Sequence, residues 1–452
     1  MNKLKKYALS SLYDMASGIS STKEQAGHGS PFVSFSTVFN NYFLPDELPD
    51  LMETSKKEQE VYSIKKGDIL ITRTSETIDE LAMSCVATKD YPCATYSGFT
   101  KRLRPKTEGI AYYKYMAFYL RSAWFRKAVT NNAFMTLRAS FNEDIFSFLN
   151  VYLPDYDVQV RIGDFLSSIE QKIGVNKRIC AELESMVKTI YDYWFTQFDF
   201  PDADGKPYRS SGGVMEWNEQ LKRKIPLGWY SDVIGNILAK VPNTVRIQTG
   251  DYLSNGNTPI IDQSADFIAG YTNNPSSVLS SPTGYVVFGD HTRIVKYVRF
   301  PFARGADGTQ ILKSKTPCVP DELLYQIVRS VDLSNYGYAR HFKFLKDTPT
   351  IIPTESVAKE FAKIATPIYD KHAHLIFENI ELTKLRDWLL PMLMNGQATV
   401  ADAEKETSNV IPFVPQTVEV RQAARNFGDK ETDDTADLVK AFMRRKKNDS
   451  KA

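Results

Sequence analysis

The chain has 452 residues, of which 42% are hydrophobic and 24% charged, and its formal net charge is only +2. This composition is typical of an ordinary globular protein of about three compact units. No stretch approaches the roughly 18 uncharged apolar residues of a membrane span. The four cysteines are scattered without a CxxC pair, which argues against a disulfide framework and a cysteine zinc site. We expect a reducing, cytoplasmic setting and no signal peptide.

Residues 1–153 are expected to form a first globular domain of the α+β class. Its β-rich stretches are PFVSFSTVF, IKKGDILITRTS and CATYSGFTKRLRP, and a helix-like stretch, YYKYMAFYLRSAWFRKAV, follows them. Short strands separated by turn residues predict a curved, mostly antiparallel sheet.

Residues 154–196 predict a first long helix. Pro154 stands just before its start, where proline is tolerated. Apolar residues then recur mostly three or four positions apart, as in the seam of a coiled coil: Val158, Ile162, Phe165, Ile169, Ile173, Leu183, Met186 and Ile190. A helix of about 35 residues is about 50 Å long.

The remaining chain repeats this order. Residues 197–226 are interpreted as a linker rich in Gly, Pro and Asp, with aromatic residues that dock it on the helices. Residues 227–352 are expected to form a second α+β domain, with strands in PTGYVVFGDHTRIVKYVRFPF and a helix in DELLYQIVRSV. Residues 353–396 predict a second long helix ended by Gly396, and residues 397–452 a polar, largely disordered tail.

An internal repeat with an offset of 199 residues organises the chain. At this offset the aligned pairs are Pro154 and Pro353, Val158 and Val357, Ile162 and Phe361, Ile169 and Ile368, and Leu183 and Leu382. The two domains share an outline rather than a sequence: Gly67-Asp68 precedes the apolar run ILIT, and Gly289-Asp290 follows the apolar run YVVF.

The chain order sets the direction of the two helices. The first helix carries the chain away from the first domain, so a second helix that packs on it must run back. We therefore expect an antiparallel coiled coil with pseudo-two-fold symmetry and one domain at each end. Gly174, Asn176 and His372 interrupt the seams, and polar interruptions often set register. The alternative is two amphipathic helices packed on their own domains.

Two segments are markedly basic although the whole chain is nearly neutral. Residues 89–138 hold 10 Lys and Arg but 2 Asp and Glu, and residues 291–346 hold 10 and 4. Two separate basic segments fit two surfaces that face phosphate groups. The alternative is that both are solvated faces of ordinary domains.

The motifs of the common enzymes that act on nucleic acids are missing. The sequence has no GxxxxGK[ST] phosphate loop and no GxGxxG motif. The tetrapeptide NPSS at 274–277 lacks the second proline and the aromatic residue of an amino-methyltransferase. The acidic string PDADGK at 201–206 is better explained as a solvated turn than as a nuclease site. His372 and His374 lie on different faces of a helix, so they are poor metal co-ligands.

Sequence readout in the major groove of DNA needs forked or amide donors on loops, backed by phosphate contacts. The candidates in the first domain are Arg73, Thr74, Ser75, Ser97, Lys101, Arg102 and Arg138. The candidates in the second domain are His291, Arg293, Arg304, Asp307, Gln310 and Arg340. Loop 304–310 is the most suggestive, because its two glycines permit close backbone approach. The alternative for each residue is a solvated turn or an ion-pair partner.

Four segments together resemble the specificity subunits of type I restriction–modification systems, over residues 1–396. They are the linker WFTQFDFPDADGKPYRSSGG with IPLGW, the helix end LTKLRDWLLPMLMNGQ, PFVSFSTVF with GDILITRTS, and FGDHTRIVKYVRFPFARGADGTQI. The resemblance implies that each domain is a target recognition domain for one half of a bipartite double-stranded DNA sequence. The helices would then act as a ruler that fixes the unread spacer.

The resemblance also implies partners for this chain. Two methyltransferase subunits would dock on the helices and the linker, and restriction/translocase subunits could join them. S-adenosylmethionine, ATP and Mg²⁺ would belong to those partners, so this chain itself would be non-catalytic. Three alternatives stay open: a DNA-recognition subunit of another defence complex, a coiled-coil adaptor that binds proteins only, and a self-contained methyltransferase or nuclease, which the missing motifs oppose.

Overall fold

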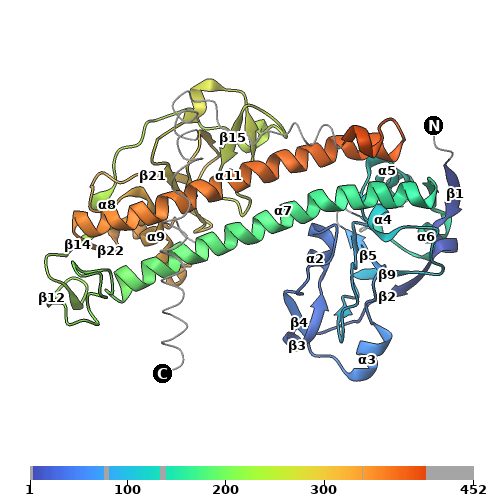
Figure 1. Cartoon of the computed structure of the whole chain (residues 1–452), viewed down its shortest axis with the longest axis horizontal. Coiled ribbons are helices and arrows are strands. Elements are labelled where there is room, and N and C mark those ends of the chain that lie inside the picture. Colours follow the sequence, from blue (N-terminus) through green and yellow to red (C-terminus); the bar gives the residue numbers. More distant parts are fainter. Residues whose placement is uncertain (1–3, 76–80, 133–138, 338–339, 404–452) are drawn as a thin grey trace. The chain divides into compact units, whose positions relative to one another are not determined.

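The computed structural model describes residues 4–75, 81–132, 139–337 and 340–403, which form two compact units. The first unit contains the described residues up to Val175 and those from Asn379 onward, and the second runs from Asn176 to Glu378. Both units combine helices with sheets, so the predicted α+β class is confirmed. Each unit includes one part of each long helix, α7 (Tyr156–Tyr191) and α11 (Glu355–Met394) (Figure 1).

The first unit is built on two small sheets. The larger has the order β2 (Tyr13–Ser17), β9 (Thr100–Pro105), β5 (Ile69–Thr72) and β7 (Ser84–Val86), all antiparallel. The smaller has the order β4 (Asp50–Met52), β3 (Ala26–Val33) and β8 (Thr95–Tyr96), with β3 and β8 parallel. Two further pairs are β1 (Lys5–Ala8) with β11 (Asn150–Leu153) and β6 (Thr74–Ser75) with β10 (Ala139–Ser140). All but one of the strand pairs of this unit are therefore antiparallel, as expected.

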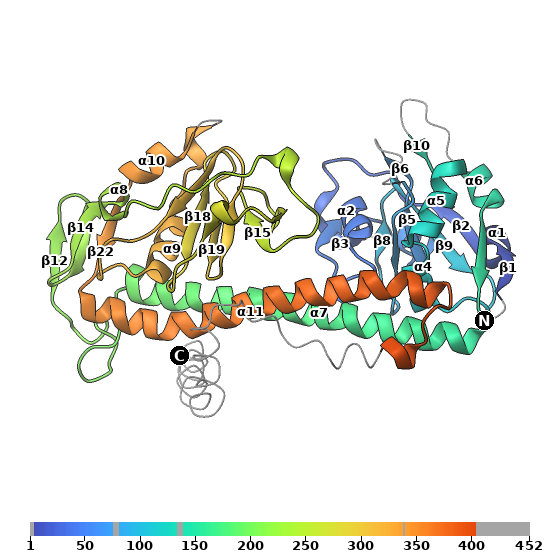
Figure 2. The same cartoon turned by 90° about the horizontal axis from the view of Figure 1, so that it is seen from above.

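Six shorter helices belong to the first unit: α1 (Leu9–Leu12), α2 (Phe35–Asn40), α3 (Lys56–Val61), α4 (Tyr113–Tyr119), α5 (Ala123–Asn132) and α6 (Glu143–Phe148). The run FSTVF was expected to be a strand, but it forms α2. The physical reason is the N-cap, because the Ser34 side chain accepts a hydrogen bond from the Thr37 N–H. Helix α4 lies beside α7 (Figure 2), where a Cβ on Gly163 would come within 2.6 Å of the Tyr115 nitrogen.

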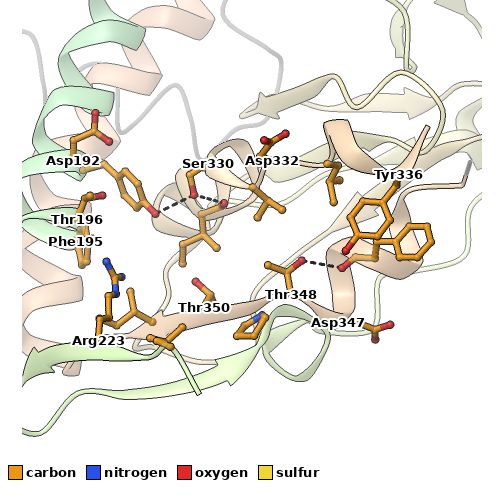
Figure 3. Close-up of a pocket in the computed structure, with 18 residues that line it drawn as sticks. Asp192, Phe195, Thr196, Arg223, Ser330, Asp332, Tyr336, Asp347, Thr348 and Thr350 are labelled. Carbon is orange, nitrogen blue, oxygen red and sulfur yellow. Dashed lines mark hydrogen bonds between the residues drawn. The ribbon is translucent and has the colours of Figure 1, made fainter. Parts of the chain in front are cut away.

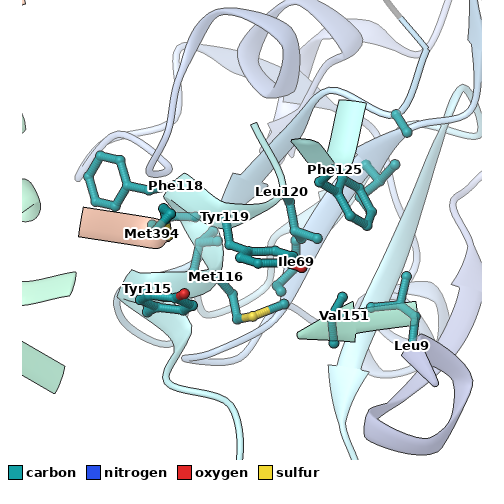
Figure 4. Close-up of a cluster of buried hydrophobic side chains, with 14 of the residues drawn as sticks. Leu9, Ile69, Tyr115, Met116, Phe118, Tyr119, Leu120, Phe125, Val151 and Met394 are labelled. Atoms are coloured by element: carbon teal, nitrogen blue, oxygen red, sulfur yellow. The ribbon is translucent and has the colours of Figure 1, made fainter. Parts of the chain in front are cut away.

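The core of the first unit gathers around α4. Tyr115, Met116 and Phe118 are fully buried, and they cluster with Ile69 of the central strand β5 (Figure 4). Met394 at the end of α11 joins the same core. Apolar residues from distant parts of the chain thus complete this core, so burial of the end of α11 contributes to the stability of the first unit.

The second unit repeats this plan with its own strands. One sheet has the order β19 (Val295–Val298), β18 (Tyr285–Gly289) and β21 (Thr309–Leu312), and the other β16 (Gly270–Thr272), β15 (Thr258–Ile261), β20 (Phe302–Arg304) and β17 (Val278–Leu279). Two further pairs are β14 (Tyr230–Val233) with β22 (Pro349–Ile352) and β12 (Met215–Asn218) with β13 (Arg223–Pro226). Its shorter helices are α8 (Ile234–Ile237), α9 (Asp321–Ser330) and α10 (Phe342–Asp347). The predicted helix DELLYQIVRSV is confirmed as α9.

Helix α9 joins the sheet of the second unit to both long helices. Almost all of its residues are buried. The Tyr325 hydroxyl donates to Glu184 of α7 at 3.0 Å, and the Gln326 side chain donates to the Tyr369 hydroxyl of α11 at 2.6 Å. The second unit is therefore layered as sheet, then α9, then the long helices.

The segment interpreted as a linker is more structured than its composition indicates. It contains the hairpin β12–β13, and a π-helical turn (Asp192–Thr196) extends α7. The Trp229 ring stacks on Phe200 at 5.0 Å between centroids and contacts Phe195 at 5.8 Å. As expected, 201–206 is a turn, in which Asp202 accepts the N–H groups of Asp204 and Lys206.

The two units share most of their topology, although β2 in the first unit and β17 in the second extend different sheets. β5 lies between β7 and β9, and β18 lies between β19 and β21. β3 pairs antiparallel with β4 and parallel with β8, and β15 does the same with β16 and β20. Helices α7 and α11 begin at the predicted offset of 199 residues, and so do β11 and β22. The two Gly-Asp pairs are not equivalent, because Gly67 precedes its strand and Gly289 ends its strand; the counterpart of Gly67 is Gly284, also at positive φ.

Within each unit the long helices run antiparallel. In the first unit, hydrogen bonds join Glu170 to Arg386 and Ile173 to Asn379. In the second unit, they join Asn176 to Glu378 and Cys180 to His372. As the residue numbers increase along α7, those of the bonded residues in α11 decrease, which is the pattern of antiparallel helices. Asn176 is fully buried, and its amide donates to the Glu378 carboxylate at 2.8 Å.

Candidate nucleic-acid interface

In the second unit, two candidate segments lie side by side at one end of β18. One follows β18 (290–294) and the other connects β20 to β21 (305–308). The Asp290 N–H donates to the Gly308 carbonyl at 2.7 Å, which continues the β18–β21 pairing beyond the strands. His291 and Asp307, which are 16 positions apart in the sequence, therefore share one loop cluster. We name residues 290–294 and 305–308 the second loop cluster.

Gln263 braces the second loop cluster, although no pattern in the sequence singles it out. Its side-chain oxygen accepts the His291 N–H at 3.1 Å, and its side-chain nitrogen donates to the Asp307 carbonyl at 2.9 Å. The Thr292 hydroxyl donates to the Gln263 backbone carbonyl at 2.7 Å. One glutamine thus fixes both loops, and only its position after strand β15 hints at this role.

The glycines of loop 304–310 are needed for the packing of the loop itself. A Cβ on Gly305 would lie 2.4 Å from the Tyr252 hydroxyl oxygen. Gly308 has φ +84°, and a Cβ there would lie 2.6 Å from the Gln263 side-chain nitrogen. Both glycines let the loop close against its own unit, whereas the sequence suggested only close approach to a ligand.

Arg304 supports this loop from inside. Its Nε donates to the Thr309 carbonyl at 2.7 Å, and its Nη2 reaches the same oxygen. Burial lowers the pKa of Arg304, and the nearby Arg246 lowers this pKa further. The guanidinium is half-buried and spans the loop it belongs to, so the structure gives it a bracing contact.

The other candidates of the second unit are more exposed. Arg293 and Arg340 are exposed, while Gln310 is half-buried on β21 opposite Phe288. Arg293 has a positive φ of 63°, and its guanidinium donates to the Leu333 carbonyl at 3.3 Å. Arg340 is tied to the loop cluster through its neighbour His341, whose N–H donates to the Asp290 carbonyl at 2.9 Å.

In the first unit, the positions equivalent to the second loop cluster lie at the end of β5. The Arg73 N–H donates to the Phe99 carbonyl at 2.8 Å, which matches the bond from Asp290 to Gly308. The turn 97–99 connects β8 to β9, just as 305–308 connects β20 to β21. Arg73 is exposed, and Thr74 and Ser75 pair with β10. We name residues 73–75 and 97–99 the first loop cluster.

Two basic candidates of the first unit point inward. Lys101 is 6% exposed and pairs with Glu143 at 3.3 Å. Arg102 is 9% exposed, and its guanidinium donates to the Ser63 carbonyl at 2.6 Å and lies over the Tyr96 ring. Both side chains therefore hold the strand β9 in place. Arg138 and residues 76–80 lie outside the described residues.

A pocket of about 610 Å³ in the second unit involves other residues (Figure 3). It lies among the end of α7, strand β13, the end of α9 and strand β22, and it contains no candidate from either loop cluster. The hydroxyls of Tyr191 and Ser330 are bonded to each other at 3.3 Å, and that of Thr348 to a backbone carbonyl. Its lining among the described residues includes the carboxyl groups of Asp192, Asp332 and Asp347 but no His, Cys or Lys.

The described residues also show no metal cluster and no membrane segment. Nowhere in them do three or more His, Cys, Asp or Glu side chains come together as a metal site. None of the helices in this part of the chain has the length and apolar character to span a bilayer. Most of the candidate residues in the described parts of the chain thus gather in two equivalent loop clusters on two similar scaffolds.

The comparisons with known proteins agree with one another, because each finds a specificity domain or subunit of a type I restriction–modification system. Residues 3–185 match the family model of the type I restriction modification DNA specificity domain. The type I restriction enzyme MjaIX specificity subunit of Methanocaldococcus jannaschii is 22% identical over 377 residues, which cover 78% of this chain and 82% of that protein. The S subunit of a type-I restriction-modification system from M. genitalium superposes with a TM-score of 0.51 at 13% identity, covering 87% of this chain and 96% of that one. At this identity the structural likeness concerns the fold alone.

Proposed function

Because the chain belongs to the type I restriction–modification DNA specificity family, we propose that it reads a bipartite DNA target and brings methyltransferase subunits to it. Each unit reads one half-site with its own loop cluster. The chain itself carries out no reaction. Its place of action is the cytoplasm, where genomic DNA is found.

The equivalence of the two loop clusters supports this proposal most directly. Each cluster lies at the end of the central strand of its sheet, and each is fixed by the same backbone bond, from Arg73 to Phe99 and from Asp290 to Gly308. The scaffolds match while the side chains differ, as expected of a protein that reads two unlike half-sites. The two basic segments of the sequence run through these units and supply phosphate contacts.

Exposure divides the candidate residues into two roles. The exposed or half-exposed side chains are proposed to read bases or contact phosphates: Arg73, Thr74, His291, Arg293, Asp307, Gln310 and Arg340. Ser75 and Ser97 also belong to the first loop cluster. Lys101, Arg102 and Arg304 are proposed to support the loops instead, because their charged groups are held by contacts within their own unit.

The long helices are proposed to form an antiparallel coiled coil with pseudo-two-fold symmetry that sets the spacer between half-sites. The antiparallel contacts within each unit support this arrangement. Helix α7 has 36 residues and α11 has 40, so they are about 54 and 60 Å long. That length corresponds to about one and a half turns of B-DNA. The buried Asn176 in the seam would fix the register of the pair.

Methyltransferase subunits are proposed to dock on the helices and on the hairpin β12–β13. The hairpin and the residues on either side of it expose three apolar side chains: Val214 is 59% exposed, Trp217 57% and Leu227 51%. Val214 and Leu227 are joined by a backbone hydrogen bond at 3.0 Å, so two of the three are neighbours. Exposed aromatic and aliphatic residues are typical of protein interfaces. Restriction/translocase subunits would join this complex, and S-adenosylmethionine, ATP and Mg²⁺ would be bound by these partners.

The proposal is tested by sequencing methylated bases in host DNA. The gene for this chain is expressed or deleted beside the neighbouring methyltransferase gene, and single-molecule sequencing records the modified sites. We expect a bipartite methylated motif that depends on this gene and supplies both half-sites and the spacer. Direct binding of the purified complex to DNA serves as the second readout, and the proposal fails if neither methylation nor binding depends on a bipartite sequence.

A further inference from the structure

The turn between β8 and β9 presents an exposed aromatic ring. Phe99 is 63% exposed, while its neighbours Ser97 and Thr100 are 8% and 0% exposed. The phenyl ring therefore projects from a turn whose other residues are packed into the unit. It has no hydrogen-bond donor or acceptor, so it offers a ligand an apolar aromatic surface.

The backbone beneath this ring is tightly held. The Phe99 N–H donates to the Ser97 hydroxyl at 3.2 Å, and the Thr100 hydroxyl donates to the Ser97 carbonyl at 2.7 Å. The Gly98 N–H donates to the Ile19 carbonyl at 2.7 Å, and a Cβ on Gly98 would lie 2.9 Å from that oxygen. A ring on such a fixed turn loses little conformational entropy on binding.

The equivalent turn of the second unit has the opposite chemistry. There the carbonyl that accepts the equivalent backbone hydrogen bond belongs to Gly308. This glycine follows Asp307, whose carboxylate is exposed. The side chain that fills this site is the amide of Gln263. The same scaffold position is thus apolar in the first unit and polar in the second.

We infer that Phe99 packs against the 5-methyl group of a thymine in the half-site read by the first unit. This inference rests on the proposed function. Among the four unmodified bases, only thymine has a methyl group on its major-groove edge, and phenylalanine is among the side chains that contact it. Arg73, whose N–H is bonded to the Phe99 carbonyl, is exposed beside the ring and supplies a polar or phosphate contact. The first half-site therefore contains an A·T pair at a position that Phe99 reads.

The test uses the complete chain assembled with its methyltransferase subunits, and DNA carrying the motif found by methylation sequencing. Each thymine of both half-sites is replaced in turn by deoxyuridine, which removes only the methyl group. We expect the wild-type complex to bind about fourfold more weakly when one particular thymine of one half-site is replaced, from about 0.8 kcal/mol for one buried methyl. The variant Phe99→Ala should bind thymine and deoxyuridine at that position equally well.

Phe148→Ala is the matched control, because Phe148 is a 72% exposed phenylalanine of the same unit outside the turn. This control should keep the wild-type response to deoxyuridine. The inference is overturned if Phe99→Ala keeps that response, if the wild type shows none, or if neither half-site contains an A·T pair. In each of these cases sequence-specific binding itself persists, whereas failure of the proposed function would remove specific binding of the wild-type complex altogether.

Discussion

Gln263 offers the sharpest test of how the second loop cluster is built. Replacing it with alanine removes two hydrogen bonds, one from the His291 N–H and one to the Asp307 carbonyl. Each neutral bond contributes about 0.5–1.5 kcal/mol, so the two together contribute about 1–3 kcal/mol to the order of the cluster. Without them the loops must be ordered when DNA binds, which weakens binding. The expected loss at the second half-site is therefore about 5- to 150-fold in affinity.

The assay measures binding of the assembled complex to DNA with the intact target and with single base changes in either half-site. Gln263→Ala should lose discrimination in the half-site read by the second unit and keep it in the other. Gln263→Glu should do no better, because it keeps an acceptor for the His291 N–H but sets a carboxylate against the Asp307 carbonyl. Gln248→Ala is the control, since Gln248 is an exposed glutamine of the same unit that does not cap its helical turn. Full discrimination in Gln263→Ala, or an equal loss in both half-sites with unchanged thermal stability, refutes the reasoning.

Three further predictions concern stability. Leu389→Ala should destabilise the first unit by about 2–5 kcal/mol, because Leu389 is 1% exposed in its core; hydrogen exchange should quicken in α4 and stay unchanged in α9. Asn176→Ala should cost about 1.5–3 kcal/mol in a denaturant titration, because it removes the amide that donates to Glu378. Burial lowers the pKa of Lys296 to about 8, so the folded second unit holds fewer protons than the unfolded chain above that pH. Its stability should rise by about 1.4 kcal/mol per pH unit from about pH 8 to 10, and Lys296→Met should abolish this rise in unfolding titrations.

The repeated plan of the chain could be predicted because it is carried by local patterns. Prolines at 154 and 353 and apolar residues at helical spacing indicate two long helices at one offset, and α7 and α11 begin at that offset. Gly396 has φ +74° just after α11 ends, as a helix stop predicts. Each of these signals depends on neighbours in the sequence, so no knowledge of the tertiary structure was needed.

The loop clusters could be predicted only in part, because exposure depends on tertiary packing. Arg102 and Arg304 have the side chains of DNA readers, yet both guanidinium groups are held by carbonyl oxygens of their own unit. Gln263 lies about 40 positions before Asp307, which it braces, so no local pattern connects the two. Phe99 belongs to an apolar class that is usually buried, and only the structure reveals its exposure.

The central claim is that each unit reads its own half-site, and an exchange of one domain tests it most directly. Residues 1–153 are replaced by the corresponding domain of a family member with a different target, and methylated bases are sequenced in cells that also express the methyltransferase subunits. We predict a new motif in which one half-site has changed, while the other half-site and the spacer length are kept. A change in both half-sites, or a motif identical to the original, would contradict the account.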